Sequence, residues 1–320
     1  MSDLRRSLEG RRVLVTGANG FMGSHLVRRL LAQGVGELHG FWLGEHQLLD
    51  GLDLQLHEID LTDPEATATA VDAIRPEFIF NLAAMVNVER KLKLAGKLFA
   101  VNTQGPINLV TACARHGFES FVHVGTCEEY GDNPTPFTED QVPNPVSPYS
   151  ASKVAATYFF RMLHKTQGLP VSVMRPFLTY GPHLRNRMLT TLLIKKGLAG
   201  ESLPMTPAEQ TREFNYVEDI VAGFVQAAES PAADGEIINL GCGEEVQIAE
   251  FAKLMMELFD GKLKVELGAL PYRPGETWHF YCSNEKAKRL LGYKPQVSLR
   301  EGLERTIEWY RARPEIVEAI

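Results

Sequence analysis

The feature that most constrains the fold is a glycine-rich turn near the N-terminus, set between an apolar run and an amphipathic segment. Val13 to Thr16 is typical of a buried strand, the turn Thr16-Gly17-Ala18-Asn19-Gly20-Phe21-Met22-Gly23 follows, and Leu26, Leu30 and Leu31 then recur at helical spacing. In such a turn the first glycine permits tight curvature, the next lets backbone N–H groups approach a pyrophosphate, and the last lets the helix pack on the strand. A glycine pattern alone is weak evidence, but this strand–turn–helix context predicts a dinucleotide site rather than a purely structural turn.

Strand-like runs continue along the chain and alternate with helical patterns. They read LQLHEID, FIFNLAA, SFVHVGT and PVSVMRPF. This alternation predicts an α/β fold: a Rossmann-type, doubly wound parallel sheet with helices on both faces. After about Gly181 the elements become shorter, and the late run EIINLGC is expected to return to the first sheet. We therefore expect a dinucleotide-binding domain over 1–178 and 214–250, interleaved with a smaller C-terminal substrate domain over 179–213 and 251–320.

Composition excludes several classes of partner. The 33 basic and 40 acidic residues give a net charge of −7 without long blocks of one sign, which argues against nucleic acid as the main partner. The four cysteines show no metal-type spacing, so we expect reduced thiols and no metal site. No apolar run approaches the roughly 18 residues that a membrane span needs, and no signal-peptide pattern is present. These observations predict a soluble, cytoplasmic protein with no membrane partner.

The end of the second strand-like run bears on the choice of cofactor. An Asp or Glu about twenty residues after the glycine turn would hold the ribose 2′-hydroxyl of NAD, and a nearby Arg would hold the 2′-phosphate of NADP. The chain reads LHGFWLGEH here, with Phe41 and Trp42 where the acid would lie and no arginine. The choice between NAD and NADP stays open on this ground, and Glu45 is a candidate for the ribose contact.

A tyrosine and a lysine supply candidate redox chemistry. Tyr149 and Lys153 are four residues apart, so on a helix they share a face. A nearby cation lowers the pKa of a tyrosine, and the phenolate can then take a proton from a substrate hydroxyl as hydride leaves the carbon. About twenty residues earlier lie Thr126, Cys127 and Glu128, of which Glu128 is a candidate proton acceptor.

Together these motifs resemble those of the extended short-chain dehydrogenase/reductases that modify nucleotide sugars. The matching segments are the glycine turn, NLAA at 81–84, VNTQG at 101–105, GTCEEYG at 125–131, YSASK at 149–153 and RPFLTYGP at 175–182. The resemblance covers nearly the whole chain. It implies NAD as cofactor, with NADP not excluded, a nucleoside-diphosphate sugar as substrate, and a homodimer built on two helices per subunit, about 98–116 and 149–167.

The resemblance also implies roles for individual residues. Thr126 would hydrogen-bond the sugar hydroxyl that is oxidised, Tyr149 would act as the base and Lys153 would hold the cofactor. The implied cofactor-binding positions are Gly17, Asn19, Gly20, Phe21, Met22, Gly23, Asp60, Leu61, Leu82, Ala83, Ala84, Asn102, Tyr149, Lys153 and Pro176. On the substrate side, Thr126, Arg212 and Arg273 are the implied contacts, and each guanidinium could pair bidentately with a phosphate. In the family, an asparagine after the RxF motif usually contacts the phosphate of the sugar nucleotide. Leu178 stands at this position here, so the resemblance does not carry that contact over.

The segment Thr126-Cys127-Glu128 leaves the exact reaction open. In the sugar-nucleotide 4,6-dehydratases the glutamate removes the C5 proton, and an aspartate, where present, protonates the leaving C6 hydroxyl. Here Cys127 occupies the aspartate position, so the thiol donates, or Glu128 does both jobs, or Cys127 is a small buried hydrophobe. Thr-Cys-Glu also resembles the 5,6-dehydratases that act on UDP-sugars.

Other activities compete with dehydration. The 4-keto-6-deoxy-hexose reductases carry a similar Ser-Ser-Glu-Glu-Tyr-Gly segment, whereas 4-epimerases usually have a small or apolar residue in place of Glu128. We expect a dehydratase, a lyase, first, with an NAD(P)H-dependent reductase or a 4-epimerase as alternatives. A non-enzymatic NAD(P)-binding sensor is disfavoured because Tyr149 and Lys153 are both present. His123 is expected to be a core histidine with satisfied ring nitrogens. Arg185 and Arg187 are expected to face solvent, with a contact of one of them to the nucleotide as the alternative.

Overall fold

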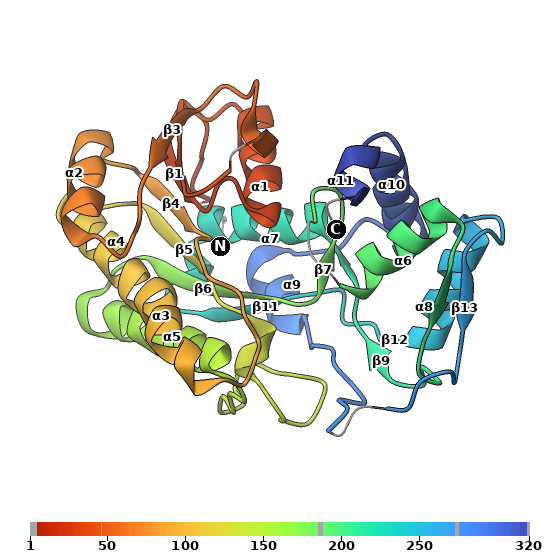
Figure 1. Ribbon diagram of the computed structural model, residues 1–320. Coiled ribbons are helices and arrows are strands. Elements are labelled where there is room, and N and C mark those ends of the chain that lie inside the picture. Colours follow the sequence, from red (N-terminus) through yellow and green to blue (C-terminus); the bar gives the residue numbers. More distant parts are fainter. Residues whose placement is uncertain (1–4, 46, 185–187, 273–274, 319–320) are drawn as a thin grey trace.

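The computed structural model describes residues 5–45, 47–184, 188–272 and 275–318 and centres on a seven-stranded sheet (Figure 1). Every pairing in this sheet is parallel, and the strand order is β11-β6-β5-β4-β1-β2-β3. The strands are β1 (Arg12–Thr16), β2 (Glu37–Trp42), β3 (Gln55–Glu58), β4 (Phe78–Asn81), β5 (Ser120–Val124), β6 (Val171–Pro176) and β11 (Ile237–Leu240). This order confirms the predicted doubly wound Rossmann-type sheet, and β11 joins it beside β6 as expected.

Both faces of the sheet are buried because apolar side chains alternate along the strands. Val13 and Val15 point into the core on one side and Leu14 into the core on the other. The first side is covered by α1 (Phe21–Ala32), α7 (Val217–Glu229) and α9 (Glu285–Leu291). The second side is covered by α2 (Pro64–Ile74), α4 (Gly105–Ala114) and α5 (Pro148–Gln167). The two layers lie on opposite sides of the strands in Figure 1.

The helix expected over 98–116 is not continuous in the structure, whereas the helix expected over 149–167 is. Instead of one continuous helix, the chain forms α3 (Ala95–Phe99), the π-helical turn η3 (Ala100–Gln104) and then α4. Pro106 has no backbone N–H to donate to the preceding turn, so the helix widens just before it. The second expected helix is continuous as α5, which begins at a Ser147 capping box with Pro148 in its first turn.

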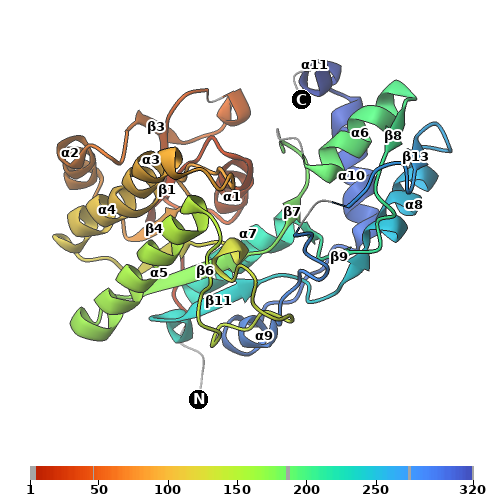
Figure 2. The ribbon, with the colours of Figure 1, turned by 60° about the horizontal axis from the view of Figure 1, so that its bottom comes forward.

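A second, smaller core lies beside the carboxyl ends of the strands (Figure 2). Its helices are α6 (Leu189–Ala199), α8 (Ile248–Leu258), α10 (Leu299–Arg311) and α11 (Pro314–Glu318). Three two-stranded pairs accompany them: β7 (Thr179–Tyr180) with β10 (Asn215–Tyr216), β9 (Thr211–Arg212) with β12 (Val246–Gln247), and β8 (Ser202–Pro204) with β13 (Lys264–Glu266). Phe214 stacks on Phe251 within this core, with ring centroids 4.1 Å apart. The domain boundaries given above stay a prediction.

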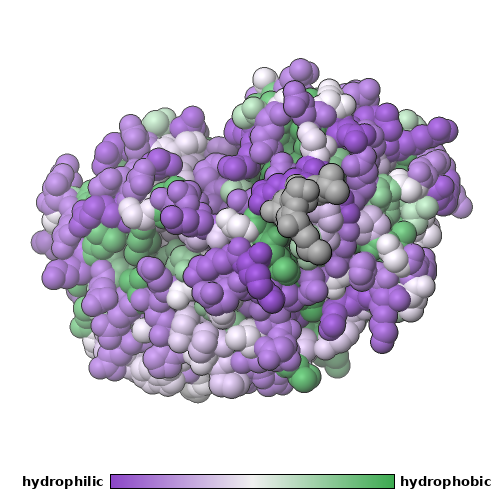
Figure 3. Space-filling model, turned by 180° about the vertical axis from the view of Figure 1, so that it is seen from behind, coloured by the Kyte–Doolittle hydropathy of each residue, from purple (hydrophilic) through white to green (hydrophobic). Residues whose placement is uncertain are grey.

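The surface is mainly hydrophilic on the face seen from behind, where apolar residues form small separate areas (Figure 3). Within the described part of the chain, no helix combines the length and apolarity that crossing a membrane requires.

Candidate active site

The glycine turn connects β1 to α1, and each of its three glycines has a steric reason. Gly17 has φ +64°, and a Cβ there would lie 2.9 Å from the Ala83 nitrogen. A Cβ on Gly20 would lie 3.1 Å from the Gly17 carbonyl oxygen, and one on Gly23 would lie only 2.1 Å from it. The start of α1 therefore packs directly on the turn, and its first N–H groups have no partner within the helix. This bare backbone fits the pyrophosphate of a dinucleotide.

Most predicted cofactor residues meet at one cavity of about 400 Å³ at the carboxyl ends of β1, β2 and β4. Those that line it are Gly17, Asn19, Gly20, Asp60, Leu61, Leu82, Ala83 and Ala84. Phe41 and Trp42 line it as well, so the end of β2 presents aromatic groups where many dinucleotide sites present an acid. Glu45 is tied to the turn, because Asn19 Nδ2 donates to the Leu43 and Glu45 carbonyl oxygens at 2.8 and 2.6 Å.

The remaining predicted cofactor residues lie outside that cavity's lining. The side chains of Phe21 and Met22 pack against the core, so only their main-chain N–H groups would face an anion. Pro176 is buried at the end of β6 beside Leu240 of β11. Asn102 is fully buried, and its amide is used by the protein: it exchanges hydrogen bonds with the Met85 main chain at 2.8 and 3.0 Å and donates to Ser152 Oγ at 3.1 Å.

Tyr149 and Thr126 come together at the start of α5 and the end of β5. Thr126 caps the short 3-10 turn η4 (Cys127–Glu129), where its Oγ1 accepts the Glu128 N–H at 3.3 Å. Both side chains are buried. Burial raises the pKa of Tyr149 although the Thr126 side chain acts to lower it. This rise is opposite in direction to the lowering expected from Lys153 alone.

Lys153 lies one helical turn further along α5 and is fully buried. Its Nζ donates to the Val124 carbonyl oxygen at 2.5 Å, which fixes the side chain against the end of β5. Burial lowers the pKa of this amine to about 8, and the nearby negative charge of Glu129 opposes the effect. His123 lies in the core, as predicted, with Nδ1 2.9 Å from Asn81 Nδ2 and its ring stacked on Phe160. The expectation that its ring nitrogens are satisfied holds only in part, since no described residue hydrogen-bonds its buried Nε2.

Glu128 and Cys127 differ sharply in their surroundings. Partial burial raises the pKa of Glu128 above the ordinary carboxyl value, while the charges of Arg90 and Arg212 oppose this rise. The negative charge of Glu128 acts in turn on Tyr149. Cys127 belongs to a buried apolar cluster with Tyr130, Phe137, Phe177 and Cys282, and burial raises the pKa of its thiol well above the ordinary value. Burial therefore raises the pKa of both groups, and the thiol is held uncharged among apolar side chains.

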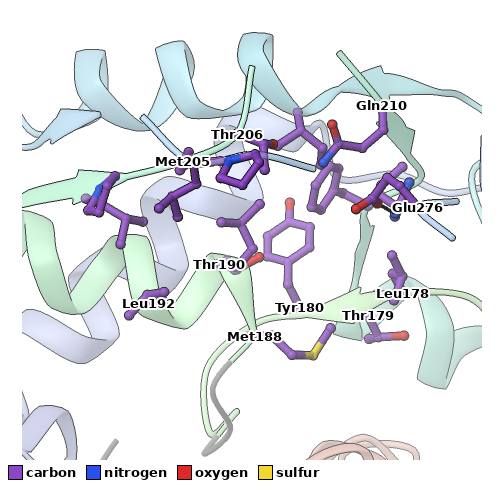
Figure 4. Close-up of a pocket in the computed structure, with 18 residues that line it drawn as sticks. Leu178, Thr179, Tyr180, Met188, Thr190, Leu192, Met205, Thr206, Gln210 and Glu276 are labelled. Atoms are coloured by element: carbon purple, nitrogen blue, oxygen red, sulfur yellow. Dashed lines mark hydrogen bonds and ion pairs between the residues drawn. The ribbon is translucent and has the colours of Figure 1, made fainter. Parts of the chain in front are cut away.

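Arg212 lies at the edge of a cavity of about 610 Å³ in the second core (Figure 4). Its guanidinium donates to Glu276 Oε1 at 3.0 Å and to the Thr277 carbonyl oxygen at 2.8 Å. Leu178 and Gln210 also line the cavity, and no described residue hydrogen-bonds the buried Oε1 of Gln210. In Figure 4, Gln210 and Glu276 lie toward one end and Leu192 toward the other. Arg273, Arg185 and Arg187 lie outside the described residues.

Three polar residues near the site were missed by sequence reasoning. Glu129 is completely buried next to Glu128, Glu276 pairs with Arg212, and Lys97 lines the cofactor cavity. For Glu129 the sequence does hold a signal. CEEYG contains a second carboxylate, and Arg175 stands within the apolar strand-like run PVSVMRPF, where a buried arginine needs an acidic partner. The sequence holds no comparable signal for Glu276, whose partner Arg212 is 64 residues away along the chain. It holds none for Lys97 either, because this residue lies on α3, outside the matching motifs.

Comparison with known proteins decides the family. Residues 13–241 match the NAD dependent epimerase/dehydratase family. The chain belongs to this family. The predicted resemblance is confirmed, and so is the prediction of NAD as cofactor, because the family is NAD-dependent.

Members of the family with different activities resemble this chain to a similar degree. A UDP-glucose 4-epimerase of Mycolicibacterium smegmatis is 32% identical, covering 95% of this chain and 100% of the relative. The dTDP-glucose 4,6-dehydratase DesIV of Streptomyces venezuelae, solved with NAD and TYD bound, is 30% identical, has a TM-score of 0.83, and covers 95% of this chain and 98% of its own. The UDP-glucuronic acid 4-epimerase of Bacillus cereus, solved with UDP-glucuronic acid and NAD, is 28% identical, has a TM-score of 0.84, and covers 94% and 99%. These relatives share the modification of nucleotide sugars.

Proposed function

We propose that this protein is an NAD-dependent dehydratase of a nucleoside-diphosphate sugar. The observation that carries the proposal is the carboxylate of Glu128, held two residues after Thr126 in the turn η4, which packs against α5, the helix of Tyr149 and Lys153. A general base works best when its pKa is moved toward the working pH, and burial moves that of Glu128 in this direction.

The cofactor would be held by the glycine turn and the cavity beyond it, with Lys153 beside it. When bound, NAD would accept the hydride from C4 and would return it at the end of the cycle, either to C6 while C5 regains a proton, which gives 4,6-dehydration, or to C4, which gives 5,6-dehydration. Thr126 positions the C4 hydroxyl, and Tyr149, as the phenolate, takes its proton. The rise in the pKa of Tyr149 on burial opposes this step, and the ammonium of Lys153 together with the positive charge of an oxidised nicotinamide would favour the phenolate against it.

Elimination follows once C4 is a ketone, because the carbonyl acidifies the neighbouring C5 proton. Glu128 takes that proton, the C5–H electron pair forms the new carbon–carbon double bond, and the C6–O bond breaks. The protonated Glu128 then returns its proton to the leaving hydroxide, which departs as water. Cys127 is not needed for this sequence, and loss of a proton from its thiol is opposed by burial among apolar side chains.

The cavity of the second core suits the nucleotide part of the substrate. It is large and mostly apolar, Arg212 offers a cation for the diphosphate, and the buried Gln210 Oε1 offers an acceptor to an N–H donor of a base. A diphosphate beside Arg212 would compete with Glu276 for the guanidinium. Since Leu178 lines the same cavity in place of the usual asparagine, the phosphate contact is assigned to Arg212 alone among the described residues.

A 4-epimerase is the second candidate, and the 32% identity to a UDP-glucose 4-epimerase favours it. Epimerisation would use the same Thr126, Tyr149 and Lys153, but it would leave the C5 proton in place. The two activities therefore differ in the mass of the product, which is lower by one water after dehydration and unchanged after epimerisation.

Substitution of Glu128 tests the proposal directly. We expect Glu128→Gln to keep substrate-dependent reduction of bound NAD, because Thr126, Tyr149 and Lys153 remain, while net turnover falls about 10²–10⁴-fold with loss of the base. Product mass and NADH absorbance are followed with UDP-glucose, UDP-glucuronic acid and dTDP-glucose. The exposed Glu65→Gln on α2 is the matched control. Unchanged turnover in Glu128→Gln, or a wild-type product of unchanged mass, contradicts the proposal.

We also propose that the protein is a homodimer formed through α3 and α5. Phe99, Tyr158 and Met162 on these helices are 39%, 46% and 40% exposed, although they are large and apolar. Tyr158 and Met162 are one helical turn apart, so they form a continuous apolar face.

A further inference from the structure

Glu129 is a fully buried carboxylate with every contact directed at the proposed redox site or its support. Its Oε2 accepts two hydrogen bonds from Arg175, from Nε at 3.1 Å and from Nη2 at 2.7 Å. Arg175 is itself fully buried on β6. The other oxygen, Oε1, accepts the main-chain N–H of Thr126 at 3.0 Å.

These contacts control where Thr126 stands. The Glu129 side chain accepts the N–H of Thr126 while Thr126 caps the same short turn, which is a reciprocal capping box. The neighbouring Gly125 leaves room for this arrangement, since a Cβ there would lie 2.6 Å from Glu129 Oε1. The main chain of Thr126 is thus fixed in the turn η4, which packs against α5, the helix that carries Tyr149.

The carboxylate of Glu129 also lies near the amine of Lys153. Lys153 Nζ donates to the Val124 carbonyl oxygen at 2.5 Å, and Glu129 Oε1 accepts the Thr126 N–H at 3.0 Å, so the two groups bind the main chain on either side of Gly125. The negative charge of Glu129 favours the protonated amine and opposes the effect of burial on the pKa of Lys153, which His123 also faces. Tyr149 faces Cys127, Glu128 and Glu129. Glu129 itself faces Arg175, whose guanidinium carbon lies 4.6 Å from the centroid of the Tyr130 ring.

We propose that Glu129 is a positioning residue for the redox step, fixing the main chain of Thr126 beside the start of α5 and holding a negative charge next to Lys153. The inference rests on the proposed roles of Thr126, Tyr149 and Lys153, but not on the fate of the C5 proton. It therefore holds equally for dehydration and for epimerisation, which begin with the same oxidation at C4.

A purely structural role is the competing explanation, because removing one partner of a buried ion pair destabilises any fold. Glu213 provides the matched control for it. Glu213 is also a fully buried carboxylate that accepts two main-chain N–H groups, those of Gly243 and Cys282, each at 2.9 Å. Neither of its partners belongs to the redox site, so Glu213→Gln reports the cost of neutralising a buried carboxylate elsewhere.

The first measurement follows the amine of Lys153 without using turnover. In protein labelled with ¹³C at lysine Cε, the Lys153 resonance is identified by its absence from Lys153→Met and titrated against pH. We expect a midpoint near 8 in the wild type, consistent with the lowered pKa of this amine, and a fall of about one pH unit or more in Glu129→Gln. Glu213→Gln should keep the wild-type midpoint. Glu129→Asp, which keeps the charge one methylene further away, should give a smaller fall and replaces Glu129→Gln if that variant does not fold.

The second measurement is the pH dependence of turnover of the NAD-loaded enzyme on whichever of UDP-glucose, UDP-glucuronic acid and dTDP-glucose it converts. In Glu129→Gln the alkaline limit of kcat should move to lower pH, with KM changed less than kcat. An unchanged Lys153 midpoint, or an equal shift in Glu213→Gln, overturns the inference. A wild-type product of unchanged mass would instead overturn the dehydratase proposal, while the Lys153 titration still decides the role of Glu129.

Discussion

At the scale of single residues, Gly23 shows how little space the dinucleotide turn allows. We predict that Gly23→Ala weakens NAD binding at least tenfold and lowers the free energy of unfolding by about 1–3 kcal/mol, because the new Cβ would lie 2.1 Å from the Gly17 carbonyl oxygen and must push α1 off the turn. Gly96→Ala in α3 is the control, since a Cβ there meets no atom within 4 Å. That change should be neutral or stabilising by up to about 1 kcal/mol. Calorimetric titration with NAD and thermal unfolding measure both effects, and wild-type affinity in Gly23→Ala contradicts the prediction.

The adjacent pair Glu128 and Glu129 shows what the sequence could not supply at this scale. The two residues have identical chemistry, and sequence reasoning assigned a role only to the first. In a 3-10 turn with three residues per turn, successive side chains point about 120° apart. Glu128 consequently faces the charges of Arg90 and Arg212, while Glu129 is buried against Arg175. Which of two neighbouring glutamates faces the substrate depends on this geometry, and composition and spacing do not encode it.

At the scale of elements, the π-turn η3 connects the cofactor side of the molecule to α5 through Asn102. We predict that Asn102→Ala lowers the free energy of unfolding by about 1–3 kcal/mol, because the main-chain groups of Met85 lose a buried partner. The affinity for NAD should fall as well, since Met85 lines the cofactor cavity. Asn133→Ala, which removes one hydrogen bond to the Val142 carbonyl oxygen outside the cofactor cavity, is the comparison. Equal losses of stability and affinity in the two variants would count against a special role for Asn102.

The same elements show how much of the fold could be predicted. The central strands were recognised because residues such as Val13, Leu14 and Val15 are apolar on both faces, and that signal is local. The widening of the helix at η3 was not predicted from the sequence. Pro106 permits either a break in the helix or a π-turn, and packing against α5 decides between them. For the same reason Asn102 was assigned to the cofactor from its motif, whereas the structure uses its amide to join Met85 to Ser152.

At the scale of the whole molecule, helix α1 links the dinucleotide turn to the second core. His25 Nε2 lies 2.9 Å from the Pro182 carbonyl oxygen, and Ser24 Oγ lies 2.9 Å from His183 Nδ1. The ring of His183 in turn lies against Trp309 of α10, with centroids 4.9 Å apart. The helix whose N-terminus would face the cofactor is therefore also attached to the part of the molecule that would hold the nucleotide.

The proposed dimer makes the last prediction at this scale. Replacing Tyr158 and Met162 together by Asp places charge on the apolar face of α5, and a desolvated carboxylate in an interface costs more than the contacts it replaces. We expect light scattering to give twice the 35.6 kDa chain mass for the wild type and a single chain mass for the double variant. Leu267→Asp changes a residue of equal exposure, 46%, outside α3 and α5 and should leave the mass unchanged. Because α5 also carries Tyr149 and Lys153, the monomer should lose turnover if the interface holds this helix in place, and a double variant that stays dimeric would locate the interface elsewhere.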